Sequence, residues 1–358
     1  MMPATIPLRI VRQVRKGMVI PAAPLALDAQ RRFDIRRQRA LIRYYLDAGA
    51  GGVAVGMHFT EFAIRRPEIG LFDPVLRACA EAIDDYAALH GRTIVKIAGL
   101  NGTTPEALSQ IETAQRFGYH FAIVSLAGWQ GRSEEAMIAH VKQLSAQMPL
   151  FGFYLSPRFG GARLPYSFWR RLVELENIHG IKIATFDRYD TLDVVRAVIE
   201  AGRQEEIALY TGNDDSIVHD LITPFEFEAG GEKRRARIVG GLLGQWACWT
   251  RQAVLLLERI HAFAAKGEAA PPELLTLAAR ITDANAAIFD AAHGFAGSIP
   301  GVKEVLRRQG LLETTLTLNP DETLSPGQKE EIDRVQAAYP ELNDDDFVRR
   351  NLGRWLES

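Results

Sequence analysis

Short apolar, β-branched runs alternate with longer amphipathic stretches along most of the chain. The runs predict strands, and the stretches between them predict helices. The predicted strands cover residues 17–27, 51–57, 93–99, 121–127, 149–155, 179–185, 206–212 and 236–241. Eight strand–helix units at a spacing of roughly 30 residues favour a parallel sheet, and a closed (β/α)₈ barrel is the leading form. A doubly wound open sheet is the alternative, but no Gly-x-Gly-x-x-Gly follows any of these strands.

Local sequence signals predict where two helices begin and indicate one solvent-exposed loop. Thr104 is predicted to cap a helix with Pro105 at its first position, and Ser133 is predicted to cap the next helix. The basic cluster EKRRAR at residues 232–237 is interpreted as a solvated loop.

We expect the barrel, with a short N-terminal segment, to occupy residues 1–266, and a C-terminal helical extension to occupy residues 267–358. The stretch LLTLAARITDANAAIFDAAH in the extension is apolar around much of its helical circumference. A free helix of this kind would expose too much apolar surface. The extension is therefore expected to pack on the barrel.

Composition narrows the class of protein. The chain has 358 residues, 47% of them hydrophobic, and a formal net charge of −2, which gives no general electrostatic reason to bind nucleic acid or an anionic membrane. Only two cysteines occur, which favours a reducing compartment over a disulfide framework or a zinc site. Pro21 and Pro24 interrupt the apolar segment near the N-terminus, and no run approaches the ~18 apolar residues of a membrane helix. We therefore expect a soluble cytoplasmic protein without nucleic-acid or membrane partners.

Two of the eight lysines lie inside predicted strands, Lys96 in TIVKIAG and Lys182 in HGIKIATFD. In one interpretation each ammonium group reaches out to a strand end or pairs with a carboxylate in the barrel. In the other, burial lowers the pKa of the lysine, so that its free amine can attack a carbonyl group. Burial alone does not decide between them, because structural ion pairs also shift pKa values.

Tyr154 favours the second interpretation for Lys182. It lies near the carboxyl end of the predicted strand one unit earlier, and consecutive barrel strands are neighbours whose carboxyl ends share one mouth. A phenol at the same site as an amine could deliver and remove the protons that Schiff-base formation requires. The alternative is that Tyr154 is a core aromatic residue whose hydroxyl group is hydrogen-bonded at the rim.

The segments FGFYLSP, HGIKIATFD and LYTGNDD, in this order, resemble the dihydrodipicolinate synthase/N-acetylneuraminate lyase family. The family patterns are Tyr-Asn-x-Pro, which residues 154–157 match except at the second position, Gly-x-Lys-x-(Ala/Ser/Thr), matched by residues 180–184, and Gly-x-Asp, matched by residues 212–214. The likeness runs from about residue 17 to residue 335. It implies a (β/α)₈ barrel that joins or cleaves 2-oxo acids, usually pyruvate, through a lysine Schiff base. It also implies a homodimer or homotetramer.

The clearest departure from the family lies in GMHFTEF, residues 56–62. The family has Gly-(Thr/Ser)-Thr-Gly-Glu at this place, where backbone N–H groups and a hydroxyl group hold the carboxylate of the 2-oxo acid. Here Met57, His58, Phe59 and Thr60 replace the first four positions, and Glu61 is retained. The N–H groups of His58 and Phe59 can still bind a carboxylate. His58 could replace the lost hydroxyl group as a proton relay, or it could only fill space at the strand end.

A second departure lies in SLAGWQGRS, after the fourth strand, where the family often has an aromatic pair. Trp129 stands alone there, and its indole can donate a hydrogen bond but cannot pass a proton. We expect it to stack on an extended substrate or to cover the mouth. Together with His58, Phe59 and Phe186, Trp129 predicts a more aromatic mouth than that of the diaminopimelate-pathway enzymes, which argues against a dihydrodipicolinate synthase itself.

The predicted catalytic residues are therefore Lys182, Tyr154 and His58. The predicted substrate-binding residues are Phe59, Thr60, Trp129, Gly212, Asn213 and Val239. We expect no cofactor and no metal ion. The expected partners are a small 2-oxo acid as substrate and further copies of the chain.

Two alternative functions stay open. A metal-dependent aldolase could use His58 and Glu61 as ligands, although the sequence identifies no third ligand. A non-catalytic barrel could bind 2-oxo acids as a sensor, because the fold alone does not imply catalysis. Retention of both Tyr154 and Lys182 argues against this second alternative.

Overall fold

Each of the eight predicted strand regions contains a strand, and these strands make one sheet. The computed structural model describes residues 6–357. The sheet has the order β1-β10-β7-β6-β5-β4-β3-β2, and a parallel bridge between Ala22 and Ala54 links the strand regions at its two ends. The expected (β/α)₈ barrel is confirmed. Its strands are β1 (Val19–Pro21), β2 (Gly52–Val55), β3 (Val95–Leu100), β4 (Phe121–Val124), β5 (Leu150–Leu155), β6 (Ile178–Ala184), β7 (Ala208–Thr211) and β10 (Ile238–Leu243).

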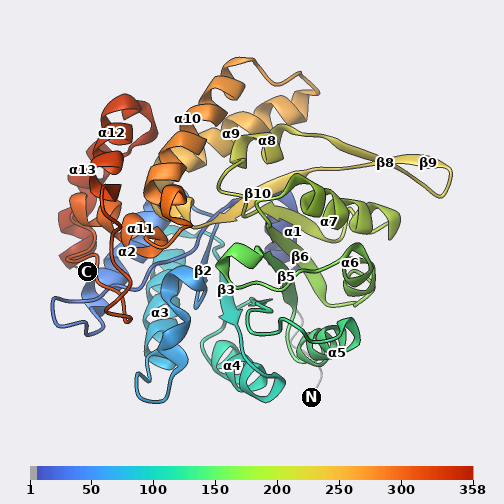
Figure 1. Ribbon diagram of the computed structural model, residues 1–358, viewed down its shortest axis with the longest axis horizontal. Helices are drawn as coiled ribbons and strands as arrows, with labels where there is room; N and C mark the ends of the chain where they lie inside the picture. The colour runs from blue at the N-terminus through green and yellow to red at the C-terminus, as the bar shows by residue number, and fades with distance from the viewer. Residues whose placement is uncertain (1–5, 358) are drawn as a thin grey trace. The chain divides into compact units, whose positions relative to one another are not determined.

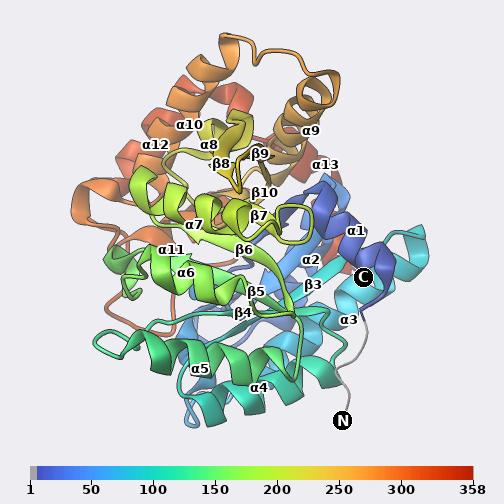
Figure 2. The same cartoon turned by 90° about the vertical axis from the view of Figure 1, so that its right-hand side faces the viewer.

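Two compact units can be distinguished along the chain. The first contains residues 97–242 and the chain up to Met18, and the second contains residues 19–96 and the chain from Leu243 onward. Figure 2 shows four helices of the first unit, α4 to α7, following one another along β4, β5 and β6. The helices of this unit are α1 (Leu8–Lys16), α4 (Thr104–Arg116), α5 (Glu134–Ser145), the short 3₁₀ turn η3 (Pro157–Phe159), α6 (Tyr166–Leu172), α7 (Arg188–Glu200) and α8 (Ile217–Ile222).

A two-stranded hairpin precedes the last barrel strand, and the sequence did not predict it. It consists of β8 (Phe225–Ala229) and β9 (Glu232–Ala236); both strands contact α7, and Figure 1 shows the turn of the hairpin at the right-hand edge of the view. The interpretation of EKRRAR as a loop was therefore wrong, because its first five residues form β9. Gly230 and Gly231, both with positive φ, make the two-residue turn that such a hairpin requires.

The predicted helix starts were correct in one case and one residue out in the other. Ser133 caps α5, since its side chain accepts a hydrogen bond from the backbone N–H of Ala136. The cap of α4 is Thr103 and not Thr104, because Thr103 forms a capping box with Glu106. The reciprocal bonds of the box fix the first turn one residue earlier than proline alone suggests.

The second unit combines the first two barrel strands with most of the C-terminal helices. Its helices are α2 (Ile35–Ala48), η1 (His58–Thr60), η2 (Phe62–Arg65), α3 (Phe72–His90), η4 (Gln245–Ala247), α9 (Thr250–Lys266), α10 (Glu273–Ile288), η5 (Ala291–His293), α11 (Ser298–Arg308), α12 (Gln328–Ala338), η6 (Pro340–Leu342) and α13 (Asp345–Glu357). None of the helices within residues 6–357 has the length and apolarity that a membrane span needs.

The last helix is fastened to α2 by buried polar and aromatic contacts. The hydroxyl group of Tyr44 donates to Asp344 Oδ2 at 2.8 Å and accepts from the N–H of Thr250 at 2.8 Å. The ring of Trp355 lies 5.5 Å from that of Tyr44, and its Nε1 donates to Asp47 Oδ2 at 2.6 Å. The C-terminal helices therefore pack within the second unit, while the expected domain boundary at residue 266 stays a prediction.

Replacing Trp355 should destabilise the protein strongly. Trp355 is 1% exposed, and Trp355→Ala removes a large buried ring together with its bond to Asp47, so we expect the free energy of unfolding to fall by about 3–5 kcal/mol. Glu357→Ala, an exposed change on the same helix, should leave it within about 0.5 kcal/mol. Urea unfolding of both variants measures this, and equal midpoints would contradict the packing described for α13.

Candidate active site

Lys182 lies on the inner face of β6, with its amine left without a hydrogen-bond partner. It pairs in register with Phe153 of β5 and Tyr210 of β7, and residues level with one another on parallel strands point to the same side. Lys182 is 7% exposed, and Nζ lies 4.5 Å from the centre of the Phe153 ring. Among the described residues the amine forms no hydrogen bond and no ion pair. A buried and unpaired lysine is rare, and it marks this place as a functional site.

Two glycines allow close packing on β6 and β7, and one of them makes room for Lys182. A Cβ atom at Gly212 would lie 2.7 Å from Lys182 Cε and 2.8 Å from the Cβ atom of Ala184, so only glycine lets the lysine stem lie against β7. At Gly180 the ring of Phe151 occupies the space of a Cβ atom, at 2.4 Å. Gly212 therefore lies against Lys182, while its predicted role in binding substrate stays a prediction.

Burial makes the amine of Lys182 easier to deprotonate. Loss of hydration lowers the pKa of Lys182 from 10.5 to about 8, and the negative charge of Asp214 acts in the opposite direction. Asp214 is itself buried, directly after Asn213 at the carboxyl end of β7. The sequence placed Asp214 in the Gly-x-Asp pattern but did not assign it to the site, although that pattern was the available signal.

Tyr154 does not share a face with Lys182, which corrects the expectation that phenol and amine meet at one site. Tyr154 pairs in register with Ile183 and not with Lys182. Its ring lies 5.3 Å from that of Trp169 on α6, and its hydroxyl oxygen accepts from the N–H of Leu164 at 3.3 Å. Because side chains alternate along a strand, Tyr154 points to the helix layer while Lys182 points inward.

The surroundings of Tyr154 fit a structural role. Its side chain is fully buried, and burial raises its pKa, with a further contribution in the same direction from the charge of Asp190. Such a phenol holds its proton and serves as a fixed hydrogen-bond acceptor between β5 and the helices. Of the two interpretations from the sequence, the second one, a core aromatic residue with a hydrogen-bonded hydroxyl group, agrees better with these contacts.

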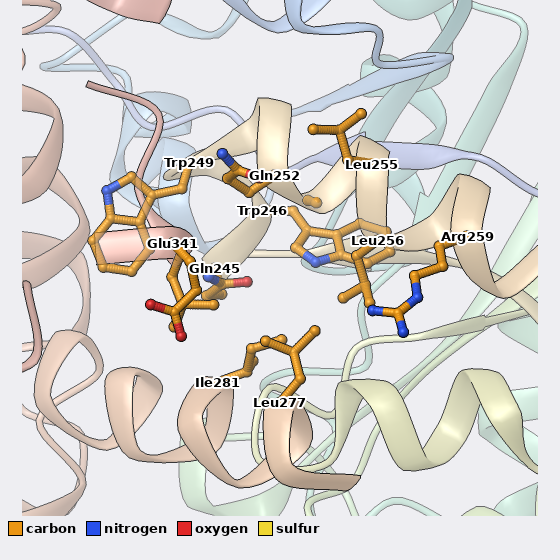
Figure 3. A pocket seen from close by; sticks show the side chains of 12 residues that line it. Gln245, Trp246, Trp249, Gln252, Leu255, Leu256, Arg259, Leu277, Ile281 and Glu341 are labelled. Atoms are coloured by element: carbon orange, nitrogen blue, oxygen red, sulfur yellow. The ribbon is translucent and has the colours of Figure 1, made fainter. Parts of the chain in front are cut away.

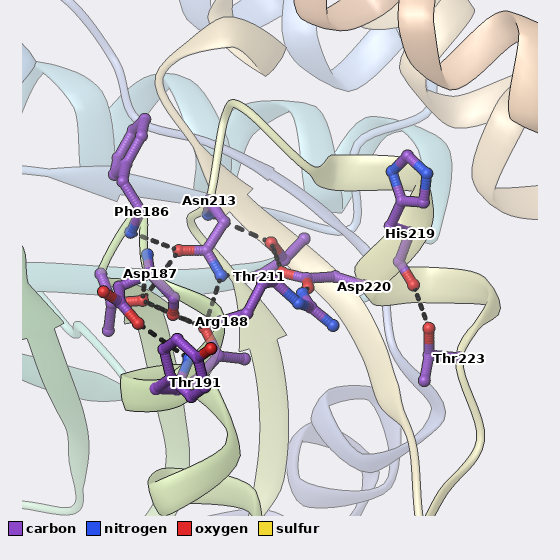
Figure 4. A network of polar contacts seen from close by, with 11 residues as sticks. Phe186, Asp187, Arg188, Thr191, Thr211, Asn213, His219, Asp220 and Thr223 are labelled. Carbon is purple, nitrogen blue, oxygen red and sulfur yellow. Dashed lines mark hydrogen bonds and ion pairs between the residues drawn. The ribbon is translucent and has the colours of Figure 1, made fainter.

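The side chain of Asn213 belongs to a buried polar network (Figure 4), and its predicted role in binding substrate stays a prediction. Its Oδ1 accepts from the N–H of Phe186 at 3.0 Å, and its Nδ2 donates to Asp220 Oδ2 at 2.9 Å and to Thr191 Oγ1 at 3.2 Å. Phe186 has φ of 54°, a backbone conformation that a bulky residue seldom adopts. Asn213 therefore stabilises the strained turn after β6, two residues beyond Ala184.

A second charged contact completes this network. Arg188, at the start of α7, pairs with the buried carboxylate of Asp220, which also accepts from the hydroxyl group of Thr211 at 2.6 Å. Burial raises the pKa of Asp220, and these donors oppose the rise. The network ties the carboxyl ends of β6 and β7 to α7 and α8, and so fixes the backbone on either side of Lys182.

The segment after β2, in the second unit, leaves the backbone N–H of Phe59 without an acceptor among the described residues. The amide of Phe59 donates to none of the described residues, whereas the amides of Thr60 and Glu61 bond to the carbonyl oxygens of Met57 and His58. Thr60 is buried, and its hydroxyl group accepts from the N–H of Gly56 and donates to the carbonyl oxygen of Ala23. Thr60 therefore has a structural role, which disagrees with its predicted role in binding substrate.

His58 and Glu61 are engaged in separate contacts. The ring of His58 packs edge-on against Phe59 at 5.4 Å. Glu61 Oε1 accepts from Lys303 Nζ at 2.7 Å and Oε2 from the N–H of Leu318 at 2.5 Å. The described residues contain no group of three His, Cys, Asp or Glu side chains that could hold a metal ion. Because both oxygens of Glu61 are already used, the metal-dependent alternative finds no support in this residue.

Three other residues that the sequence analysis identified contact other parts of the protein. Trp129 lies with one face 4.3 Å from the ring of His140 and donates to the carbonyl oxygen of Gly102, so it anchors a loop. Val239 lines a cavity together with Arg15 of α1 and with residues at the start of β7 and β10. This is the opposite end of the two strands from Asp214. Lys96 bonds both oxygens of Asp84 at 2.7 Å, which confirms the ion-pair interpretation for this lysine.

Comparison with known proteins gives one family. The model of the dihydrodipicolinate synthetase family matches residues 16–223, more than half of the chain. N-acetylneuraminate lyase 2 of Escherichia coli O6:H1 is 23% identical over 206 residues, which are 57% of this chain. The aligned region spans 63% of that lyase, less than two thirds of its length.

Solved structures of the same family share the fold. YagE, a prophage protein of the dihydrodipicolinic acid synthase family from E. coli K12 solved in complex with pyruvate, superimposes with a TM-score of 0.71 at 17% identity and covers 91% of this chain and 98% of its own. Dihydrodipicolinate synthase from Oceanobacillus iheyensis gives a TM-score of 0.72 at 16% identity over 92% and 99% of the two chains. The enzyme from Cyanidioschyzon merolae with lysine bound gives 0.72 at 18% over 91% and 99%.

Asn213→Ala should lower stability, because it leaves the N–H of Phe186 without its acceptor and removes a donor from the buried Asp220 carboxylate. We expect the free energy of unfolding to fall by about 1–3 kcal/mol. His219→Ala is the matched control, since that exposed ring on α8 makes none of the contacts drawn in Figure 4. Denaturant unfolding distinguishes the two, and an Asn213 variant as stable as the His219 variant would contradict the network.

Proposed function

Because the chain belongs to the dihydrodipicolinate synthetase family, we propose that it is a class I aldolase, lyase or dehydratase whose Lys182 forms a Schiff base with a 2-oxo acid. The observation that carries the proposal is the amine of Lys182, buried on the inner face of β6 with no hydrogen-bond acceptor and a lowered pKa. A structural lysine finds a carboxylate, as Lys96 does with Asp84. A buried amine that has no acceptor is suited to act as a nucleophile.

The chemistry requires the neutral amine. Its nitrogen attacks the carbonyl carbon C2 of the 2-oxo acid, the carbonyl oxygen takes up a proton, and the carbinolamine then loses water to give the iminium ion. With a pKa of about 8, about a tenth of Lys182 is neutral at pH 7, roughly 300-fold more than for a lysine with the ordinary pKa of 10.5. The iminium ion withdraws electrons from C3, which permits a carbon–carbon or carbon–oxygen bond to form or break there.

We propose that Asp214 supplies the charge that balances this cycle. Its carboxylate favours the cationic states of the nitrogen, namely the ammonium and the iminium ion, at a place where burial disfavours them. Tyr154, which points to the helix layer, acts in this proposal only through the packing of β5.

The residues proposed to bind the carboxylate of the substrate are inferred from the family resemblance and from one observation. The backbone N–H of Phe59 has no acceptor in the described part of the chain, which suits it to bind an anion. His58, the next residue toward the N-terminus, is proposed as the proton relay. Both roles stay predictions until they are tested kinetically.

Pyruvate is the probe of choice. It is the ligand in the complex of YagE, whose fold this chain shares. It is also the smallest 2-oxo acid with an acidic C3. The second substrate is proposed to have apolar character, because the rings of Phe159 and Phe186 lie 5.3 Å apart, tilted by 55°, beyond the carboxyl ends of β5 and β6. The expected homodimer or homotetramer and the expected cytoplasmic location stay predictions.

Incubation with pyruvate and borohydride should attach one reduced pyruvyl group, and peptide mass spectrometry should locate it on Lys182. Borohydride converts the iminium bond to a stable secondary amine, so the modification survives digestion. Lys96→Arg should be labelled like the wild type, and Lys182→Arg should not be labelled. A modification on Lys96, or on none of the lysines with any 2-oxo acid while the protein stays folded, would remove the proposal; the second result would favour the non-catalytic sensor.

The rate of this labelling should follow the ionisation of Lys182. Only the neutral amine attacks, so the rate should rise about tenfold per pH unit below pH 7 and level off above about pH 8. Asp214→Asn removes a charge that raises the pKa of Lys182, so its profile should shift to lower pH. Asp84→Asn, which changes only the partner of Lys96, should leave the profile in place. An Asp214→Asn profile identical to the wild type would show that this carboxylate does not act on the amine.

His58→Ala should reduce turnover more than stability. If His58 relays protons, kcat should fall by about 100-fold or more, while the unfolding midpoint changes little because the ring is only half-buried. His219→Ala, an exposed histidine, serves as the control for general effects. Steady-state kinetics across pH measures this, and an unchanged rate and pH profile would show that His58 only fills space.

A further inference from the structure

We propose that the second unit contains a separate binding site for a small carboxylate with an aromatic or branched aliphatic body, in the cavity between α9 and α10. The cavity has a volume of about 210 Å³ and is formed by α9, α10 and the segments η4 and η6 that flank them. All its lining residues belong to the second unit, so it is distinct from the inner face of β6 that carries Lys182.

The walls of the cavity are apolar and belong to two helix faces. Leu256 on α9 faces Leu277 and Ile281 on α10, and the last two residues are four apart, on one side of their helix. A cavity of about 150 Å³ with similar walls is large enough for benzene in other proteins, so this one accommodates a ring with a carboxylate attached. The apolar body of the ligand is therefore defined by these walls.

Two polar groups that form no hydrogen bond with the described residues define the rest of the ligand. The indole nitrogen of Trp246 donates to no residue between 6 and 357, and Figure 3 shows it turned toward the gap above Leu277 and Ile281. Arg259 lies one turn beyond Leu256 on α9, and Figure 3 shows its guanidinium group directed toward the same gap. Within the described range Arg259 has no ion pair, and its guanidinium carbon lies 5.7 Å from the centre of the Phe263 ring.

The charges around the cavity favour an anionic ligand. Glu341 also lines it, but its carboxylate is neutralised by Arg280 at 2.7 Å. Arg259 is left as the uncompensated charge, and a guanidinium group binds carboxylates through paired N–H donors. An N–H donor from Trp246 beside this cation adds a second contact for a carboxylate oxygen. A neutral ligand of the same shape would leave the charge of Arg259 unused.

Benzoate is the test probe, and benzamide is its neutral isostere. We expect isothermal titration to show benzoate binding to the full-length protein at least about tenfold more tightly than benzamide, since bonds to charged groups exceed neutral ones by this factor or more. Arg259→Gln should weaken benzoate binding at least about tenfold and leave benzamide unchanged. Trp246→Phe should weaken both ligands. Arg9→Gln, an exposed arginine on α1, should change neither.

The Lys182→Ala variant separates this site from the proposed active site. Benzoate binding should persist in that variant, because the cavity uses no residue of the first unit. Loss of binding in Lys182→Ala, equal affinity for benzoate and benzamide, an Arg259→Gln protein that binds benzoate like the wild type, or no binding of benzoate at all would each overturn the proposal. Arg259 is exposed on α9, so its replacement leaves the fold intact and the test decisive.

Discussion

The chemistry proposed for this protein depends on one constraint, the burial of the Lys182 amine without an acceptor. Water is largely excluded, since the residue is 7% exposed, and the Phe153 ring at 4.5 Å replaces only part of the lost hydration. Desolvation outweighs the attraction of Asp214, so the pKa falls to about 8. A direct ion pair would have reversed this balance, as a carboxylate in contact with an ammonium group favours its charged form. Lys96, held at 2.7 Å by Asp84, shows that arrangement within the same sheet.

The surrounding structure maintains this balance through shape and through polar contacts away from the amine. Glycine at positions 180 and 212 admits the Phe151 ring and the lysine stem, where any side chain would collide. Asn213 uses its side chain to hold the strained Phe186 turn and the Asp220 carboxylate, so the ends of β6 and β7 stay fixed. The amine is thus left without an acceptor in the described part of the chain, while the polar groups of the loops after β6 and β7 bond to one another and to α8.

Much of the fold could be predicted from the sequence, because the eight apolar runs report burial directly. The site was predicted less completely. Lys182 was identified because a charge inside an apolar run is chemically conspicuous. Tyr154 was placed wrongly because the face of a residue depends on the register between two strands, and a shift of one residue reverses it. The spacing of 28 residues between Tyr154 and Lys182 carries no information about that register. Asn213 was assigned from motif order alone, and order does not show whether a side chain is already bonded within the protein.

The most direct test of this account is a crystal structure of the protein soaked in pyruvate near pH 8. The account predicts continuous electron density between Lys182 Nζ and C2 of pyruvate, with the pyruvyl group on the inner face of the barrel and Tyr154 still bonded to the N–H of Leu164. Pyruvate bound without a covalent link, or a lysine other than Lys182 carrying it, would contradict the account.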